Sequence, residues 1–171
     1  FPLSGDNASP VDPVRHRLDL FLPPDRKVFP VLVFVHGGAW TYGDKSSFGL
    51  YSAVGRFLAE NGIGVVLPNY RLSPAVQHPE HIRDVARAFA WTVRNIHRSG
   101  GDPDNLFLSG HSAGGHLAAL LATDDRYLKA HGLSPRKIRG VIPVSGVYRI
   151  PDRLAFNLGG DDGPSALVEL G

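Results

Sequence analysis

The sequence predicts an α/β protein, a three-layer sandwich in which helices cover both faces of a mostly parallel sheet. Apolar segments at 29–35 and 63–70 alternate with amphipathic segments at 46–62 and 78–101. This alternation is typical of parallel strands joined by crossover helices. A glycine-rich turn follows segment 29–35 and another follows 106–110. Ligands of such sheets bind beyond the carboxyl ends of the strands, so these turns mark the expected functional site.

Length and composition indicate one globular domain spanning residues 1–171. Hydrophobic residues make up 43% of the chain and charged residues 20%, with a formal net charge of +2. No apolar run approaches the ~20 residues of a membrane span, and no basic block suggests a nucleic-acid partner. There is no Cys, which excludes disulfides and thiolate chemistry. The composition does not assign a cellular compartment, because it fits a cytoplasmic protein and a processed secreted protein equally well.

The first half of the chain carries two strand patterns and one helix pattern. Segment 15–23 alternates charged and apolar residues, which predicts a half-buried strand. Segment 29–35 is continuously apolar and rich in Val, which predicts a strand buried on both faces. Apolar residues recur at helical spacing over 46–62, and an Asn-Gly pair closes that helix.

The second half repeats the alternation. Its expected elements are, in order, a strand, a helix, a strand, a helix and a strand at 63–70, 78–101, 106–110, 113–123 and 138–146. Pro79 stands near the start of the long helix, and a glycine pair follows its end. Residues 147–171 are rich in Gly, Asp and Pro and show only weak patterning.

The first glycine-rich turn has the order of a phosphate-binding loop. Residues 31–47 run from an apolar strand through glycines to a Lys-Ser step. A phosphate loop requires Lys directly after its second glycine. Here Asp44 stands between Gly43 and Lys45, and its negative charge would oppose a phosphate. The bulky Trp40 also occupies a position where the backbone should curl closely. The sequence therefore disfavours a nucleotide site.

The second glycine-rich turn contains Gly110-His111-Ser112-Ala113-Gly114, which fits the G-x-S-x-G pattern. In this pattern the serine lies on a tight turn from a strand to a helix. The residues two positions before and after it crowd together and must be very small. Backbone amides and the helix dipole at such a turn favour a developing negative charge. The turn predicts Ser112 as a nucleophile.

The first turn can then supply amide donors for the same reaction. Acyl transfer needs N–H groups aimed at the oxyanion of a tetrahedral intermediate. One donor is the residue after the nucleophile, Ala113, and others come from a loop after an earlier strand. The "HGGAW" segment at 36–40 fits that loop, with Gly37 and Gly38 as donors. We interpret His36 as a scaffold that hydrogen-bonds the loop.

Together these motifs resemble the α/β-hydrolase superfamily, in particular the hormone-sensitive-lipase-like carboxylesterases and the related arylformamidases. The segments that carry the resemblance are "HGGAW" (36–40), "NYRLSP" (69–74), "HPEHIRDVARAFAW" (78–91), "DPDNLFLSGHSAGGHLAALLA" (102–122) and "GVIPVSGVY" (140–148). The resemblance implies Ser112 as nucleophile and the amides of Gly37, Gly38 and Ala113 as oxyanion hole, with no cofactor. Many relatives carry HGGG, whereas the form with Trp40 is similar to arylformamidases and some small carboxylesterases.

Other residues near the two turns are candidates for binding or support. Three are expected to line a substrate pocket: Trp40, Tyr70 and His111. His36 and Asp84 are expected to support the site, with Arg71 pairing with Asp84 beneath it. The histidines His78 and His81 are three residues apart at a helix start, but no third ligand is evident, so no metal site is predicted.

A serine hydrolase also needs a base and an orienting carboxylate. The resemblance places them after two further strands, and hence beyond Gly171. Neither His116 nor His131, the histidines downstream of Ser112, is assigned as base. The downstream aspartates fall in expected turns and are not assigned either: Asp124, Asp125, Asp152, Asp161 and Asp162. The chain has no Met and would leave strand 138–146 as an apolar sheet edge. We therefore expect an N-terminal portion of a hydrolase, completed by a missing C-terminal segment or a second chain.

The leading functional hypothesis is a serine hydrolase that cleaves short-chain carboxylic esters through an acyl-enzyme on Ser112. The first alternative is an arylformamidase, which would hydrolyse a formyl amide. The second is a non-catalytic binding protein with a hydrolase fold, if the base and acid are truly absent. The coding sequence beyond Gly171 discriminates between an enzyme and a binding protein.

Overall fold

The structure, a computed structural model, describes residues 11–149 of the chain. Its strands are β1 (Leu18–Phe21), β2 (Phe29–Val35), β3 (Gly64–Pro68), β4 (Gly101–His111) and β5 (Ile138–Val144). Its α-helices are α1 (Leu50–Glu60), α2 (Glu80–Asn95), α3 (Ala113–Thr123) and α4 (Asp125–Lys129). Short 3-10 helices are η1 (Ser47–Gly49), η2 (Ile96–Ser99) and η3 (Pro135–Lys137).

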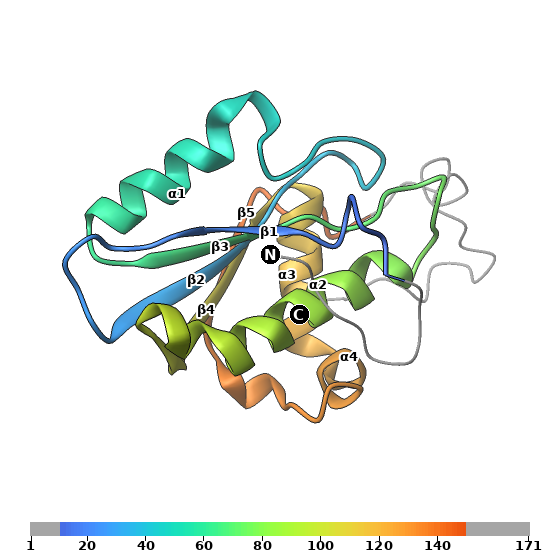
Figure 1. The fold of residues 1–171 in the computed structure, drawn as a ribbon. Helices are drawn as coiled ribbons and strands as arrows, with labels where there is room; N and C mark the ends of the chain where they lie inside the picture. The colour runs from blue at the N-terminus through green and yellow to red at the C-terminus, as the bar shows by residue number, and fades with distance from the viewer. Residues whose placement is uncertain (1–10, 150–171) are drawn as a thin grey trace.

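The five strands form one sheet in the order β1-β3-β2-β4-β5 (Figure 1). The pairs β3–β2, β2–β4 and β4–β5 are parallel, and only β1 runs antiparallel to its neighbour β3. Helical crossovers connect β2 to β3, β3 to β4 and β4 to β5 along the chain, which is the arrangement expected from the alternating sequence pattern. The predicted mostly parallel sheet is therefore confirmed.

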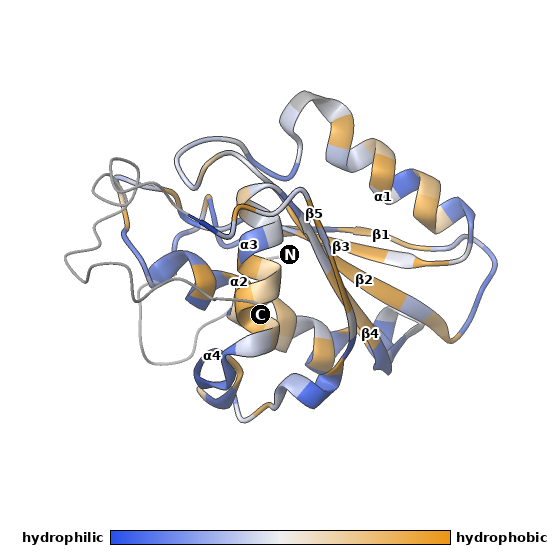
Figure 2. Ribbon diagram, turned by 180° about the vertical axis from the view of Figure 1, so that it is seen from behind, coloured by the Kyte–Doolittle hydropathy of each residue, from blue (hydrophilic) through white to orange (hydrophobic). Residues whose placement is uncertain are grey.

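Helices cover both faces of this sheet, as the three-layer prediction requires. Helix α1 lies on one face, whereas α2 and α3 lie on the other (Figures 1 and 2). The side chains of β2 alternate between the two layers, because successive residues of a strand point to opposite faces. Val33 belongs to the large core under α2 and α3, and its neighbour Phe34 belongs to the smaller core under α1. Figure 2 shows the apolar character of the central strands.

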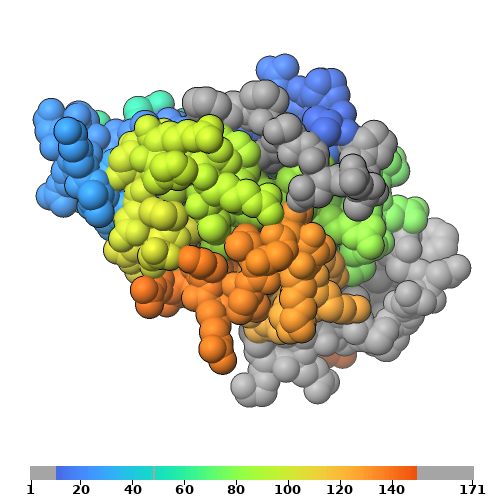
Figure 3. All heavy atoms as spheres, turned by 60° about the horizontal axis from the view of Figure 1, so that its bottom comes forward, coloured from blue at the N-terminus to red at the C-terminus, as the bar shows by residue number. Residues whose placement is uncertain are grey.

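The surface remote from α1 is built from later parts of the chain. There α2 lies beside the segment that runs through α4 and η3 (Figure 3). Helix α2 buries one face that includes Ile82, Val85 and Phe89, and each of these side chains is inaccessible to solvent. Their spacing of three and four residues is the stripe that an amphipathic helix presents to a core.

Several element boundaries differ from the sequence expectations. The first strand covers only Leu18–Phe21 of the predicted 15–23. The predicted helix 46–62 begins with η1 and becomes α-helical at Leu50. The predicted helix 78–101 begins at Glu80 and ends as a 3-10 helix at Ser99, where Gly100 takes a φ of 86°. A left-handed glycine is a common way to end a helix.

Strand β4 and helix α4 differ most from the elements that the sequence predicts. β4 begins at Gly101 rather than 106, because Gly101 already pairs with Phe29 before the register shifts. Helix α4 covers a segment that the sequence analysis left in turns, and Asp124 caps it by accepting a hydrogen bond from the backbone amide of Arg126. By contrast, α3 begins and ends where predicted, and β5 ends two residues earlier than expected.

Candidate active site

Ser112 lies on the tight turn between β4 and α3. Its backbone has φ 53° and ψ −118°, a positive-φ conformation outside the left-handed helical region that a residue with a side chain rarely adopts. The amide of Ser112 donates a hydrogen bond to the carbonyl of Val144 at the end of β5, with an N–O distance of 2.9 Å. This bond helps to hold the strained residue at the carboxyl end of the sheet, and α3 begins at the next residue.

Two glycines permit this turn. A Cβ on Gly110 would lie 2.3 Å from the carbonyl oxygen of Gly114, and a Cβ on Gly114 would lie 2.2 Å from that of Val35. Both distances are far below a van der Waals contact, so neither position accepts a larger residue without backbone movement. The predicted crowding two residues before and after the serine is therefore present.

The HGGAW loop leaves the end of β2 and contacts the serine turn directly. A Cβ on Gly37 would meet the carbonyl oxygen of His111 at 2.9 Å. Gly38 has a φ of 118°, and a Cβ there would lie 1.9 Å from the carbonyl oxygen of Tyr42. Ala39 and Trp40 also have positive φ values, 47° and 60°. The sheet therefore brings together the two glycine-rich turns that the sequence analysis singled out.

The three predicted amide donors differ in their hydrogen bonding. The amide of Gly37 donates to the hydroxyl of Tyr51, with an N–O distance of 2.9 Å. Within residues 11–149, the amides of Gly38, Ala39 and Ala113 have no hydrogen-bond acceptor. In this conformation the amide of Gly37 is thus engaged by the protein itself, and its role as an oxyanion donor stays a prediction. The amide of Ala39, which was not among the predicted donors, is unengaged.

His36 supports the loop from below. Its Nδ1 lies 2.7 Å from the carbonyl oxygen of Gly37, and its ring stacks on Tyr70 with centroids 4.3 Å apart. The hydroxyl of Tyr70 donates to the backbone oxygen of His36 at 3.3 Å. Burial lowers the pKa of His36 to about 4, so its imidazole is neutral at neutral pH. These contacts are of the kind that a scaffold residue makes, and the supporting role of His36 stays a prediction.

Two of the three residues predicted to line a substrate pocket lie in the core. Trp40 is 3% exposed and meets the ring of His116 edge-on, and Tyr70 is inaccessible to solvent. A side chain buried beneath the loop does not reach an open surface in this conformation. His111 is partly exposed beside Ser112, and its Nδ1 lies 3.1 Å from the hydroxyl of Tyr51. Its pocket-lining role stays a prediction.

A buried ionic cluster anchors the segment that carries Tyr70. Asp84 of α2 accepts hydrogen bonds from the side chain and the amide of Arg71, as the sequence analysis expected. It also lies 2.9 Å from Nε2 of His16, a partner that the sequence did not reveal. Burial by itself would raise the pKa of Asp84, but the hydrogen bonds from His16 and Arg71 outweigh burial and lower the pKa to about 2.

Within the described range, no histidine or carboxylate hydrogen-bonds the hydroxyl of Ser112. His116, four residues further along α3, is buried against Trp40. Asp124 and Asp125 pair with neighbouring cations of α4. The other downstream aspartates, Asp152, Asp161 and Asp162, lie outside the described residues. No acid–base pair of a triad is therefore assembled at Ser112 by residues 11–149.

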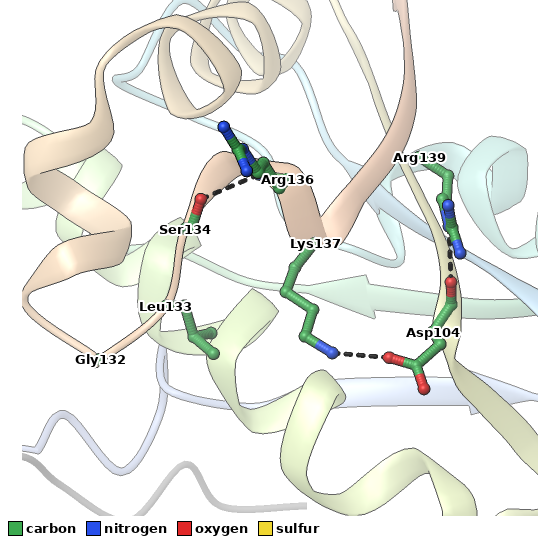
Figure 4. A pocket seen from close by; sticks show the side chains of 7 residues that line it. All are labelled: Asp104, Gly132, Leu133, Ser134, Arg136, Lys137 and Arg139. Carbon is green, nitrogen blue, oxygen red and sulfur yellow. Dashed lines mark hydrogen bonds and ion pairs between the residues drawn. The ribbon is translucent and has the colours of Figure 1, made fainter.

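A surface hollow of about 420 Å³ lies at the opposite end of the sheet (Figure 4). It is lined by residues near the starts of β5 and β4, among them Arg136, Lys137, Arg139 and Asp104. Lys137 forms an ion pair with Asp104 at 2.6 Å, and Arg139 donates to the backbone oxygen of Asp104. The hollow is therefore separate from the carboxyl ends of the strands, where Ser112 lies.

Residues 11–149 contain no cluster of three or more histidine, aspartate or glutamate side chains that could hold a metal ion. None of the helices in this range has the length and apolar character needed to cross a bilayer.

The comparison with protein-family models matches BD-FAE over residues 18–148, which includes both glycine-rich turns. The chain belongs to the BD-FAE family. LipM of Mycobacterium tuberculosis, named a probable carboxylic ester hydrolase, is 40% identical over 139 residues, covering 78% of this chain and 32% of LipM. The isoprenylcysteine alpha-carbonyl methylesterase ICME of Arabidopsis thaliana is 38% identical over 144 residues, covering 81% of this chain and 33% of ICME.

Solved structures agree with this family. Esterase B of Lactobacillus rhamnosis, solved with a tributyrin phosphonate, superimposes with a TM-score of 0.76 and 29% identity, covering 98% of this chain and 56% of esterase B. The fold is that of α/β-hydrolases, and the family is that of hormone-sensitive-lipase-like carboxylesterases, as the sequence motifs predict. The chain spans about a third of the length of the curated relatives it matches.

Proposed function

We propose that this BD-FAE chain carries the nucleophile and the oxyanion donors of a serine carboxylesterase. The observation that carries the proposal is the strained backbone of Ser112 at a glycine-crowded turn, in contact with a loop in which the amides of Gly38 and Ala39 have no acceptor among residues 11–149. Family membership and esterase relatives support the same chemistry. Neither the crowding nor the strain is needed for folding an ordinary strand-to-helix turn, and backbone strain of this kind clusters at active sites, so both support a functional role for the turn.

The proposed reaction uses two steps. The hydroxyl of Ser112 attacks the acyl carbon of an ester, and its proton passes to a base. The oxyanion of the tetrahedral intermediate accepts hydrogen bonds from the amides of Gly38, Ala39 and Ala113, and the bond to the leaving oxygen breaks as the base returns the proton to it, releasing the alcohol. Water, activated by the same base, then attacks the acyl-enzyme, and the carboxylic acid is released as the proton returns to the serine oxygen. Ala113 is the first residue of α3, where the helix dipole adds positive potential.

The base and its orienting carboxylate come from outside residues 11–149 in this proposal. Strand β5 is one edge of the described sheet, and Ile142 and Val144 on it are 57% and 43% exposed. An apolar strand with an open edge favours pairing with further chain. We propose that a further segment, or a second chain, pairs there and completes the same domain, to which residues 1–171 belong.

The substrate class is a small ester or amide, and short-chain carboxylic esters are the leading choice. The names of the relatives concern esters, which favours ester over formamide hydrolysis. The experiment compares a short nitrophenyl ester with a formyl-anilide, using protein expressed from its complete reading frame and its Ser112→Ala variant. Faster ester hydrolysis that Ser112→Ala abolishes supports the proposal. Faster formyl-anilide hydrolysis would identify an arylformamidase, and a folded protein inactive on both would indicate a binding role.

A further inference from the structure

The hydroxyl of Tyr51 connects the two glycine-rich turns. Tyr51 lies in the first turn of α1 and is 7% exposed. Its oxygen accepts the hydrogen bond from the amide of Gly37 at 2.9 Å and lies 3.1 Å from Nδ1 of His111. Gly37 belongs to the HGGAW loop, and His111 directly precedes Ser112. One phenol therefore contacts both sides of the candidate site.

The direction of these hydrogen bonds follows from the available protons. A phenol carries one proton and can also accept. Because the Gly37 amide can only donate, the oxygen of Tyr51 is its acceptor. The second contact, with Nδ1 of His111, takes its direction from the tautomer of that ring: the phenol donates when the imidazole proton is on Nε2 and accepts when it is on Nδ1. With either tautomer the hydroxyl links the two turns.

The packing around the hydroxyl shows what it adds. The ring of Tyr51 is held independently by neighbouring aromatic rings, with centroids 5.8 Å from Phe34 and 6.4 Å from His36. Gly37 approaches so closely that a Cβ would lie 3.1 Å from Nδ1 of His111 and 3.2 Å from the Tyr51 oxygen. Removing the oxygen would therefore leave the ring in place and free the amide of Gly37, while the contact of His36 with the carbonyl oxygen of Gly37 remains.

We propose that Tyr51 is a positioning residue: its hydroxyl fixes the Gly37 amide and thereby presents the next amides, of Gly38 and Ala39, to the oxyanion at Ser112. This inference rests on the proposed serine-hydrolase function. In it, Gly37 is an anchor of the loop and not an oxyanion donor.

The test is the Tyr51→Phe variant of the protein expressed from its complete reading frame. We expect kcat on a short nitrophenyl ester to fall about tenfold or more, because misplaced oxyanion donors weaken transition-state binding. KM should stay within about twofold. The matched control is Tyr42→Phe, which removes a phenol two residues after the HGGAW loop at a side chain that is 63% exposed. Its kcat and KM should equal those of the unmodified protein.

A second readout follows the hydrogen bond directly and needs no activity. Amide hydrogen exchange should be slow at Gly37 and fast at Gly38 in the unmodified protein. In Tyr51→Phe, exchange at Gly37 should accelerate at least tenfold, while Tyr42→Phe leaves it unchanged. If Tyr51→Phe does not fold, the difference in amide exchange rate between Gly37 and Gly38 in the unmodified protein still decides whether the hydrogen bond from Gly37 to Tyr51 exists.

Three outcomes separate this inference from the proposed function. Unchanged kcat in a folded Tyr51→Phe variant of an active enzyme overturns the inference and leaves the serine-hydrolase proposal standing. Fast exchange at Gly37 in the unmodified protein overturns it as well. An unmodified protein that neither hydrolyses esters nor reacts at Ser112 overturns the proposed function, and with it the role of Tyr51 in catalysis.

Discussion

The carboxylate of Asp84 accepts two parallel hydrogen bonds from the guanidinium of Arg71, from Nε to Oδ2 and from one terminal nitrogen to Oδ1, each 2.8 Å long. The backbone amide of Arg71 adds a third bond to Oδ2 at 3.0 Å. Asp84 lies in α2, whereas Arg71 follows β3 and adjoins Tyr70, on which His36 stacks. The ion pair therefore connects helix α2 to the segment whose Tyr70 packs against His36 of the HGGAW loop.

We predict that Asp84→Asn destabilises the protein by about 3–5 kcal/mol, the cost typical of breaking a buried ion pair by removing one partner. Asp84 is inaccessible to solvent, so the charge of Arg71 would lose its main partner without gaining full hydration. Urea unfolding followed by circular dichroism measures the loss. Asp104→Asn is the matched control, because it breaks the ion pair with Lys137 at a carboxylate that is 69% exposed. An equal loss of unfolding free energy in both variants would contradict the claim that the buried ion pair of Asp84 contributes more to stability than an exposed one.

Acid should destabilise the protein well above the pH at which carboxylates titrate. Burial lowers the pKa of His36, His81 and His116 to about 4 each. The unfolded chain, with histidine pKa values near 6.5, then binds more protons between about pH 6.5 and 4. Stability is therefore complete above about pH 6.5 and falls as the pH drops through this window. Each buried histidine contributes a slope that approaches about 1.4 kcal/mol per pH unit.

Urea midpoints measured from pH 7.5 to 5 test this slope. His116→Gln should reduce it by the contribution of one histidine. The control His97→Gln, at an exposed side chain, should leave it unchanged. A midpoint that stays constant from pH 7 to 5 would show that these histidines are not held neutral by burial.

Local sequence patterns were enough to predict the elements closest to the candidate nucleophile. The helix Ala113–Thr123 begins and ends where its composition and the G-x-S-x-G pattern place it. The crowding of Gly110 and Gly114 follows from the geometry of the same short pattern. Such features depend on residues within a few positions of one another, so a single sequence contains the necessary information.

Contacts between distant segments could not be predicted in the same way. The bond between His16 and Asp84 and the bond between Gly37 and Tyr51 join different elements, and no periodicity marks either of them. The burial of Trp40 was also missed, because an aromatic residue in a glycine-rich loop suits a pocket and a core equally well. Helix α4 has only five residues, too few for a periodic signal.

Substitution of the crowded glycines should disrupt the serine turn. We predict that Gly114→Ala prevents folding or displaces Ser112, since its Cβ would lie 2.2 Å from the carbonyl oxygen of Val35. Gly132→Ala is the control, because its Cβ would meet no atom within 4 Å and only its φ of 69° is strained. That strain costs roughly 1–2 kcal/mol. Thermal unfolding and ester hydrolysis measure both variants. A folded, fully active Gly114→Ala enzyme would show that the tight turn is unnecessary.

The central claim is that Ser112 is the nucleophile, and covalent labelling tests it most directly. Protein expressed from its complete reading frame is treated with a fluorophosphonate, and the modified residue is located by peptide mass spectrometry. We predict one label per molecule, on Ser112, with ester hydrolysis lost in proportion to labelling. Ser109, three residues earlier in β4, should stay unlabelled because its hydroxyl is buried and donates to the carbonyl oxygen of Ile142. A folded, ester-hydrolysing protein labelled at a residue other than Ser112 would contradict the claim.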